Sequence, residues 1–170
     1  ASKKTNEVMA YSYSNIYKLP STALRFFTVY GPYGRPDMAL FKFTKAILSN
    51  KSIKLFNKGN HFRDFTYIDD IVNGICSIIL NPPNNKIPFA VYNIGSGKTQ
   101  SLKTFIKVIE KTLNKKSIKK PLPLQKGDVY KTNADISNIK KKFNFKPKFD
   151  IFYGIGSFIK WYKDYYNKWA

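Results

Sequence analysis

The sequence predicts an α/β protein, and three observations support this. Runs rich in aromatic and β-branched residues, typical of strands, occur at residues 22–30 and 89–94. Other segments, such as 38–49, carry apolar residues at helical spacing. No internal repeat or low-complexity linker interrupts the alternation of the two patterns. Strands that alternate with helices indicate a sheet packed against helices.

The first half of the chain begins with a predicted helix over residues 2–17, which contain no helix breaker. Ser2 is suited to cap this helix, and Lys18-Leu19-Pro20 ends it. The elements expected next are strand 22–30, a Gly- and Pro-rich loop 31–37, helix 38–49, strand 53–56, a turn at 58–60 and an extended segment 65–67.

The second half begins with an apolar helix that runs from Asp69 to about Leu80 and is broken by the Pro-rich segment 81–85. Ser101 is expected to cap a later helix that ends near Leu113. The remaining expected elements are strand 89–94, a turn at 95–97, a loop after 113, a short helix near 135–143 and a final aromatic helix over about 154–166.

The charge of the chain raises the question of an anionic partner. Its 170 residues carry a formal net charge of +20, which is usual for proteins that bind nucleic acid or anionic membranes. However, 27 of the 30 basic residues are Lys and only three are Arg, whereas proteins that bind phosphates or base edges favour the bidentate Arg fork. The excess of Lys therefore indicates a general compositional bias rather than a binding surface.

Two rare residue types exclude several functions. A single cysteine, Cys76, cannot form a disulfide framework and fits a reducing compartment. A single histidine, His61, cannot by itself make a metal cluster or a Ser-His-Asp triad, so no metal site is expected. No apolar run reaches the roughly 18 residues of a membrane span, and no basic-then-apolar leader opens the chain.

The segment GSGKT at residues 95–99 invites comparison with a phosphate-binding loop, because it follows a predicted strand and precedes a predicted helix. Such a loop also needs a glycine five positions before the one preceding the lysine, and Tyr92 stands there. We therefore interpret 95–97 as a plain strand-to-helix turn. The chain also contains no G-x-G-x-x-G, so it has no dinucleotide pyrophosphate site of its own.

The three arginines are the most informative residues, because a lysine-rich chain should keep arginine where lysine cannot replace it. Arg25 lies within a predicted strand, where a buried ion pair and a functional role are both open. Arg35 follows the carboxyl end of that strand, where α/β proteins bind ligands, and Arg63 lies at another loop-to-strand junction. Together Arg35 and Arg63 suggest a small anion with a diphosphate and a carboxylate, with surface salt bridges as the alternative.

Six segments, in order along the chain, resemble the extended short-chain dehydrogenase/reductase family of nucleotide-sugar epimerases and dehydratases. They cover essentially the whole chain, and the wording GRPDMA with Thr28 is most similar to the UDP-glucuronate 4-epimerase subgroup. The segments are ASKKTNE (1–7), LRFFTVYGP (24–32), GRPDMA (34–39), RDFTYIDD (63–70), VYNIG (91–95) and PLQKGDV (123–129).

The resemblance also implies that the chain is about half of such an enzyme. Lys3 matches the lysine of the family's Tyr-x-x-x-Lys signature, so the tyrosine would stand two residues before Ala1. Residues 1–34 would be the last elements of an NAD-binding Rossmann-type doubly wound sheet. Residues 35–170 would be mainly a small α/β substrate-binding region, with residues around 64–94 returning to the Rossmann sheet.

Each candidate site residue takes its expected role from the resemblance. Lys3 would contact the nicotinamide ribose of NAD and lower the pKa of the catalytic tyrosine. Phe26 would approach the nicotinamide, with a core aromatic as the alternative. Substrate binding would fall to Thr28 for the sugar-nucleotide, Arg35 for a sugar carboxylate, Arg63 for the diphosphate and Asp128 for the uridine ribose hydroxyls.

Three other polar residues of these motifs are expected to have plainer roles. Asp64 should form turn hydrogen bonds, and Asp70 should cap a helix N-terminus. Lys42 could face the ligand, but an exposed lysine is the simpler interpretation.

The intact protein is accordingly expected to convert UDP-glucuronate to UDP-galacturonate by hydride transfer through a 4-keto intermediate, with NAD as a recycled cofactor. It would be cytoplasmic, act in polysaccharide biosynthesis and form a homodimer through helix 2–17. No nucleic acid or membrane partner is expected, and the chain alone should be inactive. The alternatives are a 4,6-dehydratase, a UDP-glucuronate decarboxylase, a stand-alone non-catalytic binding domain, and a basic nucleic-acid-binding module with exposed stacking aromatics.

Overall fold

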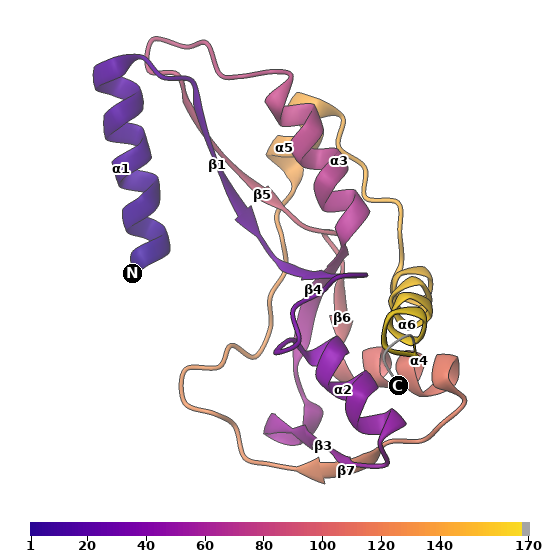
Figure 1. Ribbon diagram of the computed structural model, residues 1–170. Helices are drawn as coiled ribbons and strands as arrows, with labels where there is room; N and C mark the ends of the chain where they lie inside the picture. Colours follow the sequence, from indigo (N-terminus) through magenta and orange to yellow (C-terminus); the bar gives the residue numbers. More distant parts are fainter. Residues whose placement is uncertain (168–170) are drawn as a thin grey trace.

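The computed structural model describes residues 1–167 and confirms the α/β class (Figure 1). The strands are β1 (Ser21–Phe26), β2 (Thr28–Tyr30), β3 (Ser52–Leu55), β4 (Phe62–Tyr67), β5 (Phe89–Ile94), β6 (Thr99–Ser101) and β7 (Ile118–Pro121). The helices are α1 (Ser2–Tyr17), α2 (Ala39–Leu48), α3 (Ile68–Ile79), α4 (Leu102–Leu113), α5 (Ser137–Phe143) and α6 (Ile151–Asn167), with a 3₁₀ turn η1 (Phe56–Gly59).

The strands form three small sheets that are mostly parallel. β1 pairs in parallel with β5, from Ser21 opposite Phe89 to Phe26 opposite Ile94. β2 pairs in parallel with β4, and β4 pairs antiparallel with β6. β3 and β7 form a separate parallel pair at the far end of the molecule (Figure 1). Parallel pairing of strands distant in sequence requires helical crossovers, which matches the alternation predicted from the sequence.

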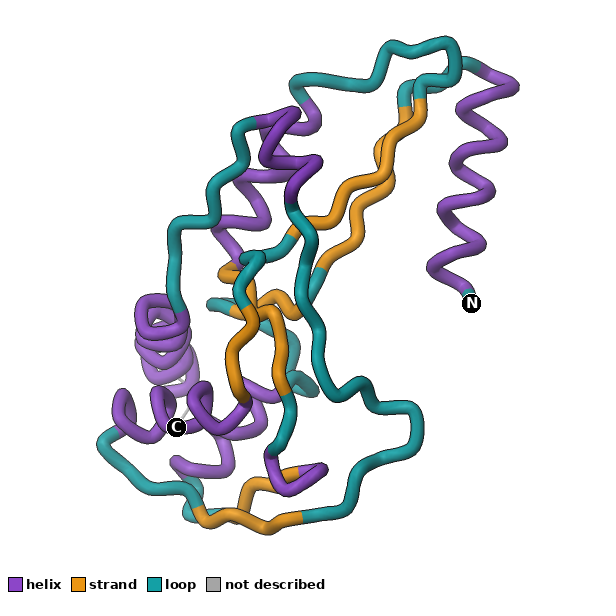
Figure 2. The backbone as a smooth tube through the Cα atoms, turned by 180° about the vertical axis from the view of Figure 1, so that it is seen from behind, coloured by secondary structure: helices purple, strands orange, loops and turns teal. Residues whose placement is uncertain are grey.

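Two apolar clusters hold these elements together. The helices that contribute to them lie beside the strands in Figure 2. The larger cluster lies between β2, β4 and the helices α2, α4 and α6, where Phe65 stacks on Phe105 with ring centroids 4.0 Å apart. The smaller cluster lies between α3, α5 and β5 and includes the fully buried Ile94.

Several element boundaries differ from those expected. The single strand expected over 22–30 is broken at Phe27. The N–H of Phe27 donates to the Ile94 carbonyl at the end of β5. Beyond Phe27 the chain continues as β2, which pairs with β4. Helix α1 has Ala1 as its N-cap residue, so Ser2 lies inside the helix and is not the cap. Ser101 does cap α4, since its hydroxyl accepts from the Thr104 N–H at 3.0 Å.

Two strands were not expected at all. β6 lies between turn 95–97 and α4, so the turn leads into a strand rather than directly into a helix. β7 lies in the lysine-rich segment that the sequence analysis left as loop, and all four of its residues are exposed. The expected division of the chain at residue 34 stays a prediction.

In residues 1–167 we find no helix whose length and hydropathy would let it cross a bilayer.

Candidate functional site

Two adjoining pockets lie beside β2, and four of the six residues singled out from the sequence line them. The first, of about 420 Å³, is formed by β2 and the loop that follows it, and Thr28 and Arg35 line it. The second, of about 630 Å³, is lined by Thr28, Arg63 and Asp128 among others. Since Thr28 borders both pockets, one elongated ligand could extend from Arg35 to Asp128.

The loop after β2 is shaped to bring Arg35 to the first pocket. The Gly34 N–H donates to the Gly31 carbonyl at 3.2 Å and closes a tight turn. Gly31 has φ of 147°, and a Cβ there would lie 2.6 Å from Cγ2 of Ile68, so only glycine fits. Tyr33 adopts a left-handed φ of 59° and packs its ring against Trp161 of α6, with centroids 5.1 Å apart.

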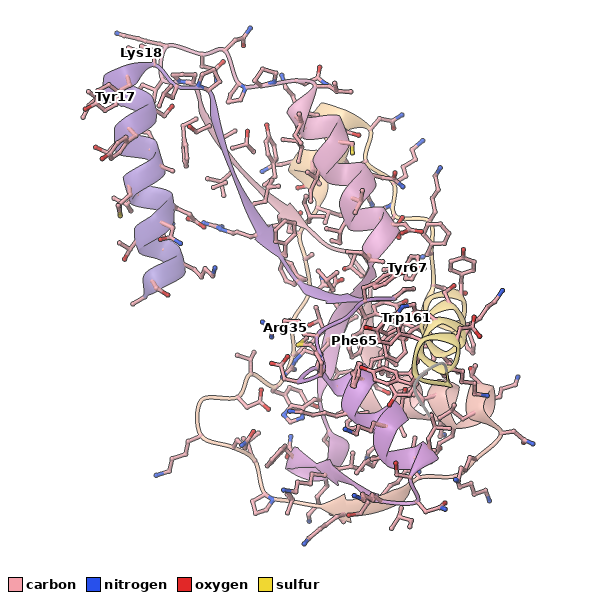
Figure 3. The ribbon with its side chains drawn as sticks, in the orientation of Figure 1. Tyr17, Lys18, Arg35, Phe65, Tyr67 and Trp161 are labelled. Atoms are coloured by element: carbon pink, nitrogen blue, oxygen red, sulfur yellow. The ribbon has the colours of Figure 1, made fainter. Side chains whose placement is uncertain are left out.

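The Arg35 guanidinium is oriented and largely exposed (Figure 3). Its Nε lies 3.2 Å from Oδ1 of Asp37, and its Nη2 donates to Oδ2 of Asp37 at 3.2 Å and to the Met38 sulfur at 3.5 Å. Nη1 makes no hydrogen bond to any residue in the described range 1–167, and the side chain is 74% exposed. A guanidinium that is held along one edge and keeps free N–H donors can donate hydrogen bonds to a carboxylate.

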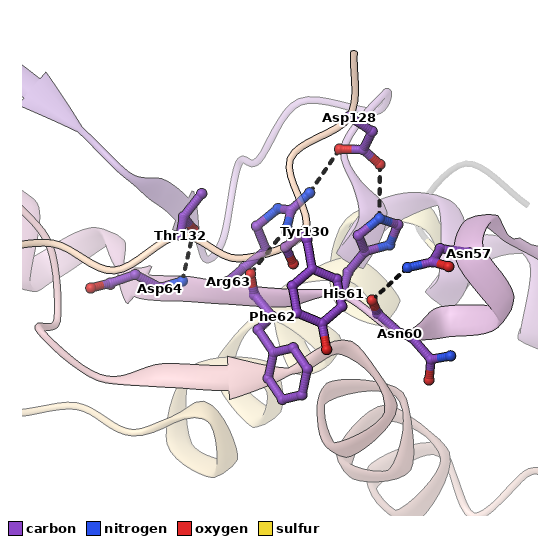
Figure 4. A network of polar contacts seen from close by, with 9 residues as sticks. All are labelled: Asn57, Asn60, His61, Phe62, Arg63, Asp64, Asp128, Tyr130 and Thr132. Carbon is purple, nitrogen blue, oxygen red and sulfur yellow. Dashed lines mark hydrogen bonds and ion pairs between the residues drawn. The ribbon is translucent and has the colours of Figure 1, made fainter. Parts of the chain in front are cut away.

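The second pocket contains a polar cluster formed by Arg63, Asp128 and His61 (Figure 4). Nη2 of Arg63 donates to Oδ1 of Asp128 at 2.8 Å, while Nη1 donates to the carbonyls of Phe62 and Tyr130 at 3.0 and 3.2 Å. Nε2 of His61 lies 3.2 Å from the other Asp128 oxygen, Oδ2. The cluster thus presents a fixed guanidinium beside a carboxylate, which suits a diphosphate next to hydroxyl groups.

The fully buried Asp64 carboxylate holds together the chain segments around this cluster. It accepts hydrogen bonds from the backbone N–H groups of Ser96 at 2.8 Å, Gly97 at 2.9 Å and Ala134 at 3.1 Å. A Cβ on Gly95 would lie 2.4 Å from that of Ala134, so the two segments approach closely. The structural role expected for Asp64 is confirmed, and its carboxylate occupies the turn amides that a phosphate would need.

Asp70 departs from its expected role. Tyr67, not Asp70, is the N-cap residue of α3, and no side-chain capping bond forms there. Asp70 lies in the first turn of α3 and accepts from the N–H groups of Lys148 and Phe149 at 2.9 and 3.1 Å. It therefore anchors the segment that leads into α6 instead of capping its own helix.

Arg25 forms the ion pair that was one of its two expected roles. Its Nε and Nη2 donate to the two Glu7 carboxylate oxygens at 2.6 and 2.7 Å and tie α1 to β1. These hydrogen bonds from Arg25, together with Lys4, lower the pKa of Glu7 to about 2. The pair is only partly buried, because the Arg25 side chain remains 47% exposed.

Lys3 and Phe26 line neither of the two pockets. Phe26 is the last residue of β1 and is half exposed. Lys3 lies on α1, one turn before the Glu7 that pairs with Arg25 of β1. Phe26 ends β1 at the carboxyl edge of the parallel β1–β5 pair, the edge where open α/β sheets bind ligands.

Sequence reasoning missed three residues that shape the site. His61 was considered only as a metal or triad member, and Met38 and Tyr33 were not considered for any role. As the only histidine of the chain, His61 could have been singled out, but nothing in its local sequence connects it with Asp128. Lys42, treated as a default exposed lysine, does line the second pocket.

These features define an α/β protein with two adjoining pockets beside β2, one lined by Arg35 and the other by Arg63 and Asp128. Residues 1–95, more than half of the chain, match the model of the NAD dependent epimerase/dehydratase family. The chain belongs to this family.

Relatives and solved structures agree with that assignment. Protein CapI of Staphylococcus aureus is 46% identical over 99% of this chain and 54% of its own length, and the probable UDP-glucuronate 4-epimerase of Rhizobium meliloti is 41% identical with the same coverage. The Bacillus cereus UDP-glucuronic acid 4-epimerase, solved with UDP-glucuronic acid and NAD, superposes with a TM-score of 0.87 at 33% identity, over 95% of this chain and 51% of that one. The chain thus spans about half the length of the curated relatives it matches.

Proposed function

We propose that this chain forms the sugar-nucleotide-binding half of an NAD-dependent UDP-glucuronate 4-epimerase, which interconverts UDP-glucuronate and UDP-galacturonate. The observation that carries the proposal is the pair of adjoining pockets, with Arg35 at one end and Arg63 and Asp128 at the other. UDP-glucuronate carries a carboxylate on one side of its hexose and a diphosphate on the other. These two anionic groups match the arginines at the two ends of the pair of pockets. Relatives and solved structures named for this activity support the assignment.

At the sugar end, Arg35 binds the C6 carboxylate. Its free Nη1 donors and the edge already fixed by Asp37 favour a bidentate contact with a planar anion. Thr28 borders both pockets, so its hydroxyl contacts the sugar where the ligand passes from one to the other. This end separates glucuronate from neutral hexoses.

At the nucleotide end, Arg63 binds the diphosphate and Asp128 accepts hydrogen bonds from the uridine ribose hydroxyls. Arg63 is pre-oriented by the carbonyls of Phe62 and Tyr130, so little side-chain entropy is lost when a phosphate binds. Asp128 keeps acceptor capacity because, among the residues that the structure describes, each of its oxygens faces one protein group.

The residues present fit part of a dinucleotide site. The half-exposed Phe26 ring ends β1 at the carboxyl edge of the β1–β5 pair, where the nicotinamide end of NAD would approach, and Lys3 lies on α1, the helix that the Glu7–Arg25 pair ties to β1. When bound, NAD supplies the hydride acceptor and donor for C4 of the sugar. Lys3 contributes a positive charge that lowers the pKa of a neighbouring tyrosine and holds a ribose hydroxyl. The tyrosine and the Gly-rich pyrophosphate loop come from residues outside these 170.

The intact enzyme is further proposed to be a cytoplasmic homodimer with no nucleic acid partner. Helix α1 supports the dimer, because it carries large apolar side chains that are exposed in this chain. They are Val8, Met9, Tyr11, Tyr13, Ile16 and Tyr17. A second copy that packs α1 against α1 would cover them.

The proposal is tested by joining this chain to the N-terminal half of the S. aureus relative and incubating the product with UDP-glucuronate and NAD. We expect UDP-galacturonate to form, and anion-exchange chromatography detects it. Release of carbon dioxide from UDP-glucuronate would identify a decarboxylase instead, and conversion of a neutral nucleotide-sugar to a 4-keto-6-deoxy product would identify a dehydratase. The 170-residue chain alone is the control and should give no product; turnover by it would contradict the need for the other half.

A further inference from the structure

His61 is the most deeply buried of the titratable side chains that line the second pocket. Its side chain is 5% exposed, and its Nε2 makes no hydrogen bond to any residue of 1–167, although it lies 3.2 Å from Oδ2 of Asp128. A buried imidazole nitrogen without a well-formed hydrogen bond is costly, so its placement beside a ligand-facing carboxylate calls for an explanation.

The two partners differ in how firmly the fold holds them. The backbone of His61 is fixed, because its carbonyl accepts from the Leu102 N–H at 2.8 Å at the start of α4. Asp128 lies in the long connection between β7 and α5, and within residues 1–167 its backbone makes one hydrogen bond, from its N–H to the Gln125 carbonyl at 3.2 Å. The direction of the Asp128 carboxylate therefore depends on side chains from the neighbouring segment.

Those side chains approach the carboxylate from two sides. Nη2 of Arg63 donates to Oδ1, and Nε2 of His61 lies 3.2 Å from Oδ2, so one protein side chain faces each carboxylate oxygen (Figure 4). Each carboxylate oxygen has two lone-pair sites, so each keeps one for a ligand. Two free sites on one fixed carboxylate match the two adjacent hydroxyls of a ribose.

We infer that His61 is a positioning residue that orients Asp128 toward the ribose hydroxyls of a bound nucleoside diphosphate. This inference rests on the proposed function, since it assumes that the second pocket receives the UDP part of the substrate. His61 acts through Asp128 and does not itself contact the nucleotide. It makes recognition of the ribose depend on a side chain that the family motifs in this chain do not include.

The test measures binding of UDP and of 2′-deoxy-UDP to the full chain by titration calorimetry, for the unaltered protein and for His61→Met and His61→Gln. Methionine fills a similar volume but cannot donate a hydrogen bond, whereas glutamine can. One hydrogen bond corresponds to roughly a five- to tenfold change in affinity. His61→Met should weaken UDP by about that factor and 2′-deoxy-UDP by much less, and His61→Gln should restore most of the preference for UDP.

A purely structural role gives a different pattern, with both nucleotides weakened equally or neither affected, and either outcome overturns the inference. If His61→Met does not fold, His61→Asn replaces it, because the shorter amide cannot reach Oδ2 of Asp128 from the same backbone position. Failure of the unaltered chain to bind UDP at all would instead contradict the proposed function. The two failures are therefore distinguishable.

Discussion

Arg63 and Asp128 are 65 positions apart in the sequence, yet Nη2 of Arg63 lies 2.8 Å from Oδ1 of Asp128. The contact joins β4 to the connection between β7 and α5, and it is partly shielded from water, with the Arg63 side chain 19% and the Asp128 side chain 31% exposed. The position of each group in the second pocket thus depends on the other.

Replacing Asp128 by asparagine should weaken UDP binding about tenfold. Asparagine keeps the shape but removes the charge that orients Arg63 and the second acceptor for a ribose hydroxyl. Calorimetric titration with UDP measures the effect. Asp164→Asn, an exposed acid on α6 away from both pockets, is the matched control and should bind UDP unchanged. Equal affinities for the Asp128 and Asp164 variants would contradict the assigned role.

In the restored two-half enzyme, Arg35→Lys should raise the KM for UDP-glucuronate about tenfold. Lysine keeps the positive charge but loses the planar fork that matches a carboxylate. The turnover of UDP-glucose, which has no carboxylate, should change little, so the ratio of the two specificities is the readout. Arg25→Lys is the control, since Arg25 pairs with Glu7 outside both pockets. An unchanged ratio would show that Arg35 does not contact the sugar carboxylate.

The helices could be predicted from local pattern, and the strands only in part. Helix 102–113 has both a capping serine and an apolar stripe that includes the buried Phe105 and Ile109, so its sequence determines its start and its packing face. β7 has no such pattern, because all four of its residues are exposed and it exists only through pairing with β3. The break between β1 and β2 is likewise invisible within one continuous apolar run, because it is set by where β5 ends.

The residues of the candidate site likewise divide into those that local sequence indicates and those that only tertiary contacts reveal. Arg35 and Arg63 could be singled out as candidate ligand-binding residues because arginine is rare in this chain, and that role stays a prediction. The role predicted for Asp128 came only from the family resemblance, since nothing in its local segment indicates a partner in β4. His61 was missed because the role we infer for it depends on its proximity to Asp128, which only the tertiary structure creates.

The packing of Tyr33 on Trp161 should fix the loop that carries Arg35. Tyr33 is 80% exposed and has a left-handed φ of 59°, an unfavourable conformation for a tyrosine, so the contact with Trp161 has to offset local strain. Tyr33→Gly relieves the strain but removes the ring. We expect faster amide hydrogen exchange over residues 31–35 in that variant with little change in thermal stability. Tyr33→Phe keeps the ring and should exchange like the unaltered protein; if the glycine variant does so too, the ring does not hold the loop.

The Glu7–Arg25 pair should make stability depend on pH in a defined acidic range. The pKa of Glu7 falls from 4.5 to about 2 in the folded chain, so the folded state favours the ionised carboxylate. This stabilisation is fully present above the unfolded pKa of 4.5 and is lost as the pH falls toward 2. Glu7→Gln removes it at all pH values. The difference in Tm between the unaltered chain and Glu7→Gln, followed by circular dichroism, should therefore be largest above about pH 5 and should shrink steadily below it. Other carboxylates titrate equally in both proteins and cancel in the difference. A Tm difference that stays constant from pH 7 to pH 2.5 would mean that the ion pair does not couple α1 to β1.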